Sequence, residues 1–448
     1  MRRILVGLLL LPLSLTFSSS TQAATRFTPT KSAQLAPAAN CRIANPQEFA
    51  DRPNSIGFPR PQVFGNLKNP KILVVPYSFA DTTSPILPVA YANSILKMVS
   101  QYYDAQSYGQ SHLTFLTTPI DPASKLPAQI KLGTYAKDFN YKYVDENTND
   151  TRGFVIKLAA LADPSWHLEN YESVIFQTSD SRMAYTGIAF TSQKSQMEQD
   201  KILAPGGMVE SAVLSVIGDP VVNHELGHAL FRFLDLYTNF TSKYDLMGDG
   251  YNLDPNLFAW HRWLAGWLKD SQVRCIESTG TTSHHLSSVN AKDSDAKMVL
   301  VHRSKTSGVA IEQRDGGLIL YSIDTTIPTG RGPIRVYDNK RNPFSKANAK
   351  IQYSGLDITI KSCNKIGCDF TLANQQPYDA SAPVAAPAPA PSAAPTSAPE
   401  PPRPTLDLST VAMGQPCNGF AGITAVNPKN ETFLCKVESD GNTHWVLP

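Results

Sequence analysis

Two histidines four positions apart make Val221 to Leu230 (VVNHELGHAL) the segment best suited to metal chemistry. On a helix, His224 and His228 lie on one face, so both imidazoles can bind one ion. Glu225 lies beside them, where a carboxylate can take a proton from a water at the metal instead of binding the ion. The alternative, a structural helix with two capped histidines, would bury three polar side chains with no metal to offset the cost.

A catalytic zinc ion takes three protein ligands, and Asp235 is the closest carboxylate after the two histidines. The next are Asp245, Asp249 and Asp254. If the helix continued, Asp235 would share the histidine face but lie roughly 10 Å along the axis from His228. Asp235 therefore reaches the ion only if the chain turns back, and no glycine between these two residues marks such a turn. We predict Asp235 as the third ligand.

The elements that would position these residues follow from the hydrophobic pattern. Residues 71–79 and 173–177 are predicted strands, and 91–103 and 154–161 are predicted helices. This alternation predicts an α+β catalytic domain over residues 71–270, in which helices, including the one with the histidines, pack on a mixed sheet. An all-β domain is predicted for 271–375, on the strand-like segments 298–301, 308–312, 318–321 and 356–360.

The two ends of the chain have distinct compositions. Residues 1–24 combine Arg2 and Arg3 with an apolar run and small residues, which predicts a secretory signal peptide and a secreted protein with no transmembrane anchor. Residues 25–70 form a lead-in or a pro-segment. Residues 376–405 are a Pro/Ala-rich linker, and 406–448 form a small disulfide-stapled module, for which surface attachment and a passive tail are both open.

Composition limits the partners. Without the signal peptide the chain carries 38 basic and 38 acidic residues, so it has no general attraction for nucleic acid. It contains no serine-hydrolase elbow, P-loop or dinucleotide fingerprint. Residues 145–150 are rich in calcium-type ligands but lack the glycine and final glutamate of an EF-hand, which favours a solvated loop over a structural Ca²⁺ site.

Cysteines in an exported protein are expected to form disulfides. Proximity along the chain favours the pairs Cys363–Cys368 and Cys417–Cys435, and Cys41 and Cys275 then remain as a long-range pair. In the alternative, a Cys41 thiolate occupies the open zinc position of a latent enzyme until a pro-segment is cleaved.

The segments around the histidine motif resemble the immune inhibitor A-like secreted zinc metallopeptidases. Besides HELGH, the similar segments are Asp235-Leu236-Tyr237, Tyr244 to Gly250, Ala259-Trp260 to Gly266-Trp267, Tyr102-Tyr103 to Ser107-Tyr108-Gly109, Glu312, Arg314 and Gly317-Leu318. The family usually has a glycine three residues after its second histidine and an aspartate three residues later. Here Phe231 occupies the glycine position, and Asp235 comes one residue late.

The resemblance implies a zincin-type catalytic domain of metzincin kind, in which Met247 lies in the methionine turn beneath the ion. Tyr244 and Tyr251 are candidates for stabilising an oxyanion. The helical spacing of the residues that follow predicts core rather than a substrate platform: Phe258, Trp260, Trp263, Leu264 and Trp267.

Together these features predict a secreted zinc-dependent endopeptidase that cleaves protein or peptide substrates, with Glu225 as general base. The irregular spacing at Phe231 and Asp235, with the proline-rich linker and terminal module, supports an alternative. In that alternative the chain is a catalytically inactive surface or adhesion protein that keeps the peptidase fold.

Overall fold

The structure is a computed structural model of the chain. It describes residues 32–47, 54–60, 67–82, 89–133, 150–178, 187–191, 203–204, 207–208, 211–215, 219–237, 243–248, 256–337, 343–381, 413, 415, 424–426, 431–437 and 443–446. The predicted signal peptide, the residues 145–149, most of the linker and Cys417 lie outside the described residues, as do Asp249, Tyr251 and Asp254.

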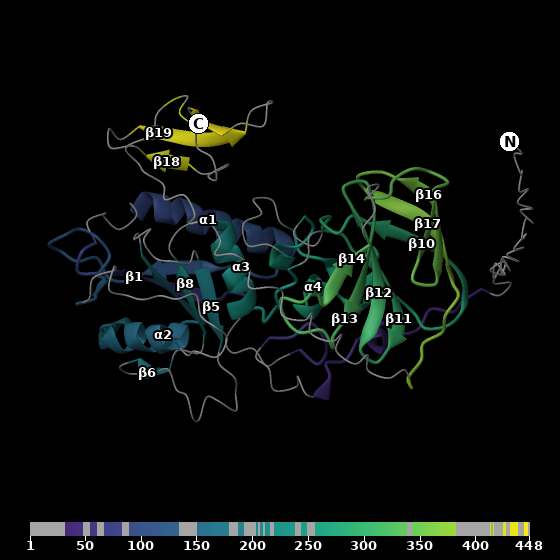
Figure 1. The fold of residues 1–448 in the computed structure, drawn as a ribbon, viewed down its shortest axis with the longest axis horizontal. Helices are drawn as coiled ribbons and strands as arrows, with labels where there is room; N and C mark the ends of the chain where they lie inside the picture. The colour runs from purple at the N-terminus through teal and green to yellow at the C-terminus, as the bar shows by residue number, and fades with distance from the viewer. Residues whose placement is uncertain are drawn as a thin grey trace, which may run out of the picture.

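The first half of the chain is built on a sheet of six strands (Figure 1). The order is β2-β1-β4-β8-β5, and β3 also pairs with β1. All pairs are parallel except β5 with β8. The strands are β1 (Lys71–Ser78), β2 (Thr114–Thr117), β3 (Ile130–Lys131), β4 (Ser173–Gln177), β5 (Gly187–Thr191) and β8 (Ser211–Ser215).

Strand β1 lies between β2 and β4 in this sheet and is buried on both faces, which explains its continuous apolar sequence. Ile72 and Val74 face a core formed with helices α1 (Val89–Gln106) and α3 (Asp219–Ala229). Leu73 and Val75 face a second core formed with helix α2 (Asp150–Leu161). Helices therefore cover both faces of the sheet, as Figure 1 shows for α1 and α2.

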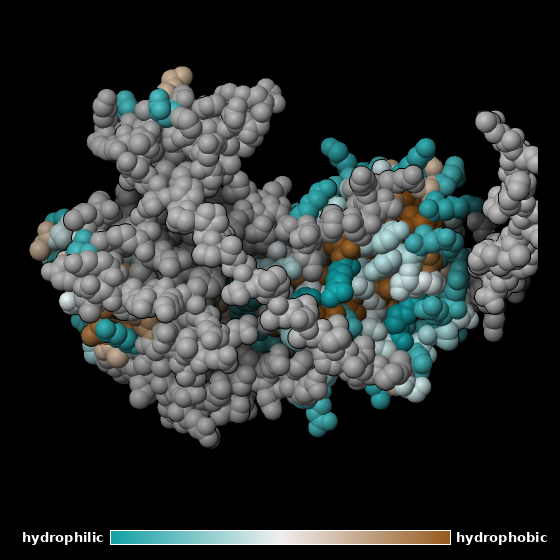
Figure 2. Space-filling model, viewed as in Figure 1, coloured by the Kyte–Doolittle hydropathy of each residue, from teal (hydrophilic) through white to brown (hydrophobic). Residues whose placement is uncertain are grey.

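The second half is a sandwich of two antiparallel-rich sheets. One has the order β14-β13-β12-β11-β9 and the other β10-β17-β16-β15, and their facing residues form a third core. The strands are β9 (Val273–Ile276), β10 (Gly280–Ser287), β11 (Met298–Ser304), β12 (Ser307–Arg314), β13 (Gly317–Asp324), β14 (Ile334–Val336), β15 (Lys350–Tyr353), β16 (Leu356–Cys363) and β17 (Gly367–Asn374). The described surface of this half is mainly hydrophilic in the view of Figure 2, with apolar residues recessed between.

One hydrophobic core joins the two halves. The outer face of the five-stranded sheet, with residues such as Leu300 and Ile319, packs in the same cluster as Leu226 of α3. Helix α4 (Ala259–Leu264) lies between them, and the predicted core residues of its segment are all buried there: Phe258, Trp260, Trp263, Leu264 and Trp267. The boundary expected at residue 270 thus separates two architectures that share a core.

The described part of the lead-in packs into this core. Ile43 and Ile56 are buried, and Cys41 forms a disulfide with Cys275. The alternative in which a Cys41 thiolate binds the metal is therefore wrong, because the Cys41 sulfur is already bonded to Cys275. Cys363 pairs with Cys368 across the β16–β17 hairpin, as predicted. Both disulfides are compatible with an extracellular protein.

The remaining described elements are short. They are the 3₁₀ turns η1 (Ala38–Cys41), η4 (Pro164–Trp166), η5 (Leu168–Asn170), η6 (Leu246–Gly248) and η7 (Asp270–Gln272), the pair β6 (Leu203–Ala204) and β7 (Gly207–Met208), and the sheet β18 (Thr424–Val426), β19 (Thr432–Val437) and β20 (Thr443–Val446). Among the described helices, none combines the length and apolarity needed to cross a membrane.

Candidate metal centre

Helix α3 carries three of the four residues predicted for the metal chemistry. Its side chains Val222 and Leu226 are buried in the core that it shares with α1. On the α1 side, the hydroxyl of Tyr103 donates to the backbone carbonyl of Asn223 at 2.5 Å. This packing fixes the helix from which the two histidines project.

The chain turns back just after this helix. Arg232 adopts the left-handed conformation, with φ 60°, which glycine usually occupies at helix ends. The amide of Arg232 donates to the carbonyl of His228, and the amide of Phe233 donates to that of Gly227, both at 3.1 Å. A non-glycine residue thus makes the turn that the sequence leaves unmarked, at a conformational cost of about 1–2 kcal/mol. The turn returns Asp235 to the histidines.

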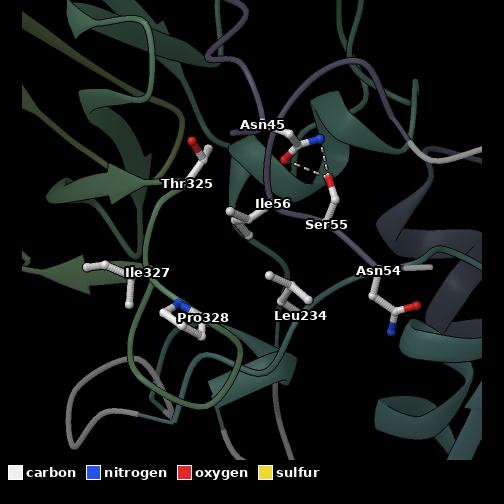
Figure 3. Close-up of a pocket in the computed structure, with 8 residues that line it drawn as sticks. All are labelled: Asn45, Asn54, Ser55, Ile56, Leu234, Thr325, Ile327 and Pro328. Carbon is white, nitrogen blue, oxygen red and sulfur yellow. Dashed lines mark hydrogen bonds between the residues drawn. The ribbon is translucent and has the colours of Figure 1, made fainter. Parts of the chain in front are cut away.

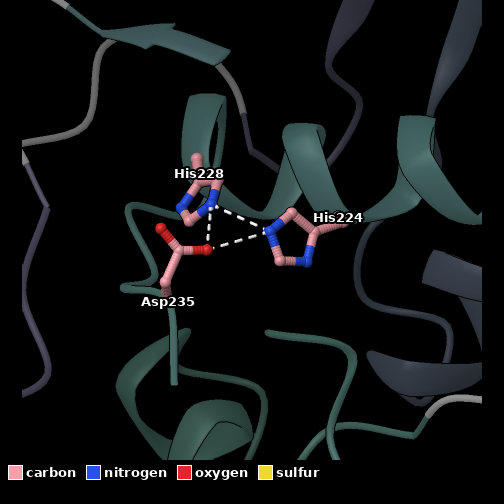
Figure 4. A group of neighbouring side chains, drawn as sticks. All are labelled: His224, His228 and Asp235. Atoms are coloured by element: carbon pink, nitrogen blue, oxygen red, sulfur yellow. Dashed lines mark hydrogen bonds and ion pairs between the residues drawn. The ribbon is translucent and has the colours of Figure 1, made fainter. Parts of the chain in front are cut away.

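The side chains of His224, His228 and Asp235 converge on one point (Figure 4). The Oδ1 atom of Asp235 lies 3.0 Å from the Nε2 atom of each histidine. The two Nε2 atoms are 3.2 Å apart. Two ligand atoms bound to a tetrahedral zinc ion at about 2.0–2.1 Å lie roughly 3.3 Å from each other. The three side chains are therefore spaced to share one such ion.

Backbone carbonyls orient both imidazoles. The Nδ1 atom of His224 lies 2.9 Å from the carbonyl oxygen of Leu246, and that of His228 lies 2.7 Å from the carbonyl oxygen of Phe233. Because a carbonyl only accepts, both Nδ1 atoms carry hydrogen. In the neutral rings the Nε2 lone pairs then face the Asp235 carboxylate. Three acceptors this close repel one another unless a proton or a metal cation lies between them, and the second case is the arrangement of a metal site.

The donor set matches catalytic zinc. Two imidazole nitrogens and one carboxylate oxygen give three protein ligands and leave the fourth position open. The exposed fraction of the Asp235 side chain is 22%, whereas that of the His224 side chain is 3%. The group is therefore open to solvent on the Asp235 side.

Glu225 is next to this group but is not part of it. Its carboxylate accepts a hydrogen bond from the backbone amide of Ala189 in the edge strand β5. Burial raises the pKa of Glu225 above its usual range, and the two histidines act in the opposite direction. A buried carboxylate that interacts with both histidines and Asp235, with an increased proton affinity, is suited to the role of general base.

Met247 lies directly beneath the histidine helix. It is fully buried in the turn η6, and its sulfur is so close to Gly227 that a Cβ atom added there would lie 2.8 Å from it. Gly227 stands between the two histidines in the sequence, and its lack of a side chain leaves room for the methionine sulfur. The preceding residue, Leu246, supplies the carbonyl that orients His224.

Contacts from distant parts of the chain hold the loop that carries Asp235. Its backbone amide donates to the hydroxyl of Thr329 at 3.1 Å, and its carbonyl accepts from the amide of Gly330 at 3.0 Å. On the other side, the side-chain amide of Asn54 donates to the carbonyl of Phe233 at 3.2 Å. The sequence does not indicate these contacts, because nothing local links residues so far apart.

A small pocket lies where these segments meet, beside the Asp235 loop (Figure 3). Ile56 of the lead-in, Leu234 of the Asp235 loop and Pro328 of the β13–β14 loop point toward it. Its polar residues Asn45 and Ser55 bond to each other at 2.8 Å. The lead-in and the second half of the chain thus both support the third predicted ligand.

The metal-free trio is a strongly coupled ionic group. Burial favours neutral His228, but the Asp235 carboxylate outweighs it and raises the pKa of His228 to about 9. Burial likewise opposes ionisation of Asp235, but the two histidines hold the pKa of its carboxyl well below the usual range. One proton therefore takes the place of the cation in the metal-free protein at neutral pH.

Zinc binding is expected to release roughly one proton per ion at pH 7.5, because a ligating imidazole must be neutral. The raised pKa of His228 stabilises the metal-free fold fully below the ordinary value of 6.5, and this stabilisation is lost as pH rises through about 9. Apparent zinc affinity should accordingly increase up to about tenfold per pH unit between these values. Calorimetry in buffers of different ionisation enthalpy measures the release. A zinc affinity that does not vary with pH in this range would contradict the expectation.

The other sequence candidates have different outcomes. Tyr244 is buried in the main core, where its carbonyl accepts from Arg314, and a role of its hydroxyl at an oxyanion stays a prediction. Tyr251 lies outside the described residues. Asp245 is not a ligand of the trio; its buried carboxylate accepts from the Met247 amide at 2.8 Å.

No family model matches the chain, and no curated protein matches it. Fold and site together define it as an α+β protein with a candidate three-ligand metal centre.

Proposed function

We propose that this protein is a secreted zinc-dependent endopeptidase with a zincin-type catalytic domain. The observation that supports the proposal is the convergence of two Nε2 atoms and one carboxylate oxygen, spaced so that they can share one cation. His224, His228 and Asp235 would hold the ion. When bound, zinc supplies a Lewis acid that lowers the pKa of water and polarises a carbonyl group.

Glu225 accepts the proton of the water that attacks the scissile carbonyl, and then donates it to the leaving amine. Its raised pKa supports both steps, since the carboxyl must gain and lose a proton near neutral pH. Burial beside Ala189 holds the carboxylate in place. On the helix it lies between the two histidines, next to the metal site without being one of the three converging side chains.

The edge strand β5 supports peptides as the substrate class. It runs antiparallel to β8, which is its one neighbour among the described strands, and it packs against α3. An extended peptide can pair with such an edge through main-chain hydrogen bonds. A peptide paired there would place its backbone beside Glu225, which already contacts this strand.

The alternative function, a catalytically inactive surface protein, has less support from sequence and structure together than from the sequence alone. Its main argument was the late position of Asp235, and the left-handed turn at Arg232 compensates for the extra residue. The C-terminal module, on which surface attachment rests, is described only in its strands β18 to β20.

The proposal is tested by hydrolysis of an unfolded protein substrate. We expect activity that a chelator removes and that stoichiometric zinc restores after the chelator is dialysed away. Cleavage that resists the chelator, or its absence from zinc-loaded, folded protein, would overturn the proposal.

A further inference from the structure

The carbonyls that orient the two histidines belong to segments outside helix α3. Leu246 lies in the η6 turn, and Phe233 lies in the loop after the left-handed turn. Neither carbonyl lies within an α-helix or a strand. Ligand orientation must be fixed to within about 0.5 Å, so these two segments need support from elsewhere.

His261 of helix α4 contacts both segments. Its Nδ1 atom lies 2.8 Å from Oδ2 of Asp245, and both side chains are completely buried. The same carboxylate accepts from the amides of Met247 at 2.8 Å and Phe258 at 2.6 Å. Asp245 directly precedes Leu246, so the bond from His261 fixes the start of the turn whose carbonyl orients His224.

The other contact is made by the ring. The His261 imidazole packs on the ring of Phe233, with centroids 4.5 Å apart and planes inclined by 31°. The carbonyl of Phe233 orients His228. One buried imidazole therefore supports both carbonyls that orient the metal-site histidines. Its hydrogen bond to Asp245 supports the carbonyl of Leu246, and its packing on the Phe233 ring supports the carbonyl of Phe233.

The chemistry of His261 is confined to these contacts. Its Nε2 atom is buried and has no hydrogen-bond partner among the described groups, so the polar contact of the ring is the one to Asp245. An unpaired buried nitrogen costs free energy, and an aromatic residue would fill the same space without that cost. The cost of the unpaired nitrogen is offset if the hydrogen bond that His261 donates to Asp245 is required to hold the η6 turn.

We propose that His261 is a positioning residue of the metal centre, which sets zinc affinity by fixing the Leu246 and Phe233 carbonyls. The inference rests on the proposed metal site but concerns residues that do not touch the ion. Loss of such outer contacts typically lowers metal affinity about 10–100-fold. His261→Phe keeps the packing on Phe233 and removes the donor to Asp245. His261→Asn can donate from the Nδ1 position but loses the ring.

The test measures zinc affinity of the full chain by competition with a chromophoric chelator, with the absorption spectrum of the Co²⁺ form as a report of ligand geometry. We expect His261→Phe to bind zinc about 10–100-fold more weakly with an altered Co²⁺ spectrum, and His261→Asn to recover part of the loss. The matched control is His302→Phe. His302 is likewise buried, lies 3.1 Å from a carboxylate oxygen of Glu277 and packs on Tyr378, but it stands in strand β11 away from the trio.

Wild-type zinc affinity in both His261 variants would overturn the inference, as would an equal loss in His302→Phe. If His261→Phe does not fold, His261→Gln replaces it, because its amide extends to the Nε2 position and misses Asp245. Equal affinities of the Asn and Gln variants would then contradict the inference. Failure of the wild-type protein to bind zinc would instead overturn the proposed function, and this inference with it.

Discussion

Glu225→Gln is expected to reduce hydrolysis of an unfolded protein substrate about 10²–10⁴-fold, the range that general-base catalysis contributes. The amide fills the same space but cannot accept the proton of the attacking water. Glu225 is not among the three converging ligands, so the variant should keep the zinc content of the wild type. The rate is measured on metal-loaded protein, with zinc determined in the same sample.

The matched control is Glu169→Gln. Glu169 pairs with His167 in the turn region η4–η5, and 27% of its side chain is exposed. The same change of carboxylate to amide should leave activity unaltered there. Unreduced hydrolysis by Glu225→Gln, with the wild type sensitive to chelators, would contradict the role assigned to Glu225. Loss of zinc from this variant would instead mean that Glu225 takes part in metal binding.

Glu312→Gln is expected to lower the free energy of unfolding by about 3–5 kcal/mol, because it leaves a buried cation unpaired. The Oε1 atom of Glu312 lies 2.6 Å from a guanidinium nitrogen of Arg314. The exposed fractions of the Glu312 and Arg314 side chains are 0% and 2%. Its Oε2 atom also accepts from the Ala259 amide at 2.7 Å and from the Tyr321 hydroxyl at 2.9 Å. This carboxylate of β12 therefore fixes the start of α4, the helix that carries His261.

Chemical denaturation of the wild type and the variant measures this loss. Arg42→Gln is the control, since Arg42 pairs with Asp270 at the surface, where 46% and 45% of the side chains are exposed. An exposed pair is expected to contribute less than about 1 kcal/mol. An unfolding free energy in Glu312→Gln equal to that of the control would contradict the stabilising role assigned to this buried pair.

The fold was predictable where pattern and burial agree. The apolar run of β1 predicts a strand buried on both faces, and 173–177 is the exact extent of β4. The predicted helices are observed with longer bounds, Val89–Gln106 and Asp150–Leu161. The edge strand β5 was not predicted, because five residues at an edge carry little periodic signal.

The site was predictable in part. HELGH gives both histidines and Glu225, since their spacing alone sets their relation on a helix. The place of Asp235 depends on the left-handed conformation of Arg232, which no sequence rule assigns to arginine. His261 lies within an aromatic helical segment, and its role depends on Asp245, sixteen residues away and buried. Sequence carries no signal for such a tertiary contact.

The metal content of the purified chain tests the central claim most directly. Protein refolded with zinc and dialysed should hold about one zinc ion per chain, as a site with three protein ligands predicts. A variant with both His224→Ala and His228→Ala should hold none while it keeps its disulfides and folded spectrum. A wild-type chain that is folded and free of zinc after this treatment would contradict the metal centre and the peptidase built on it.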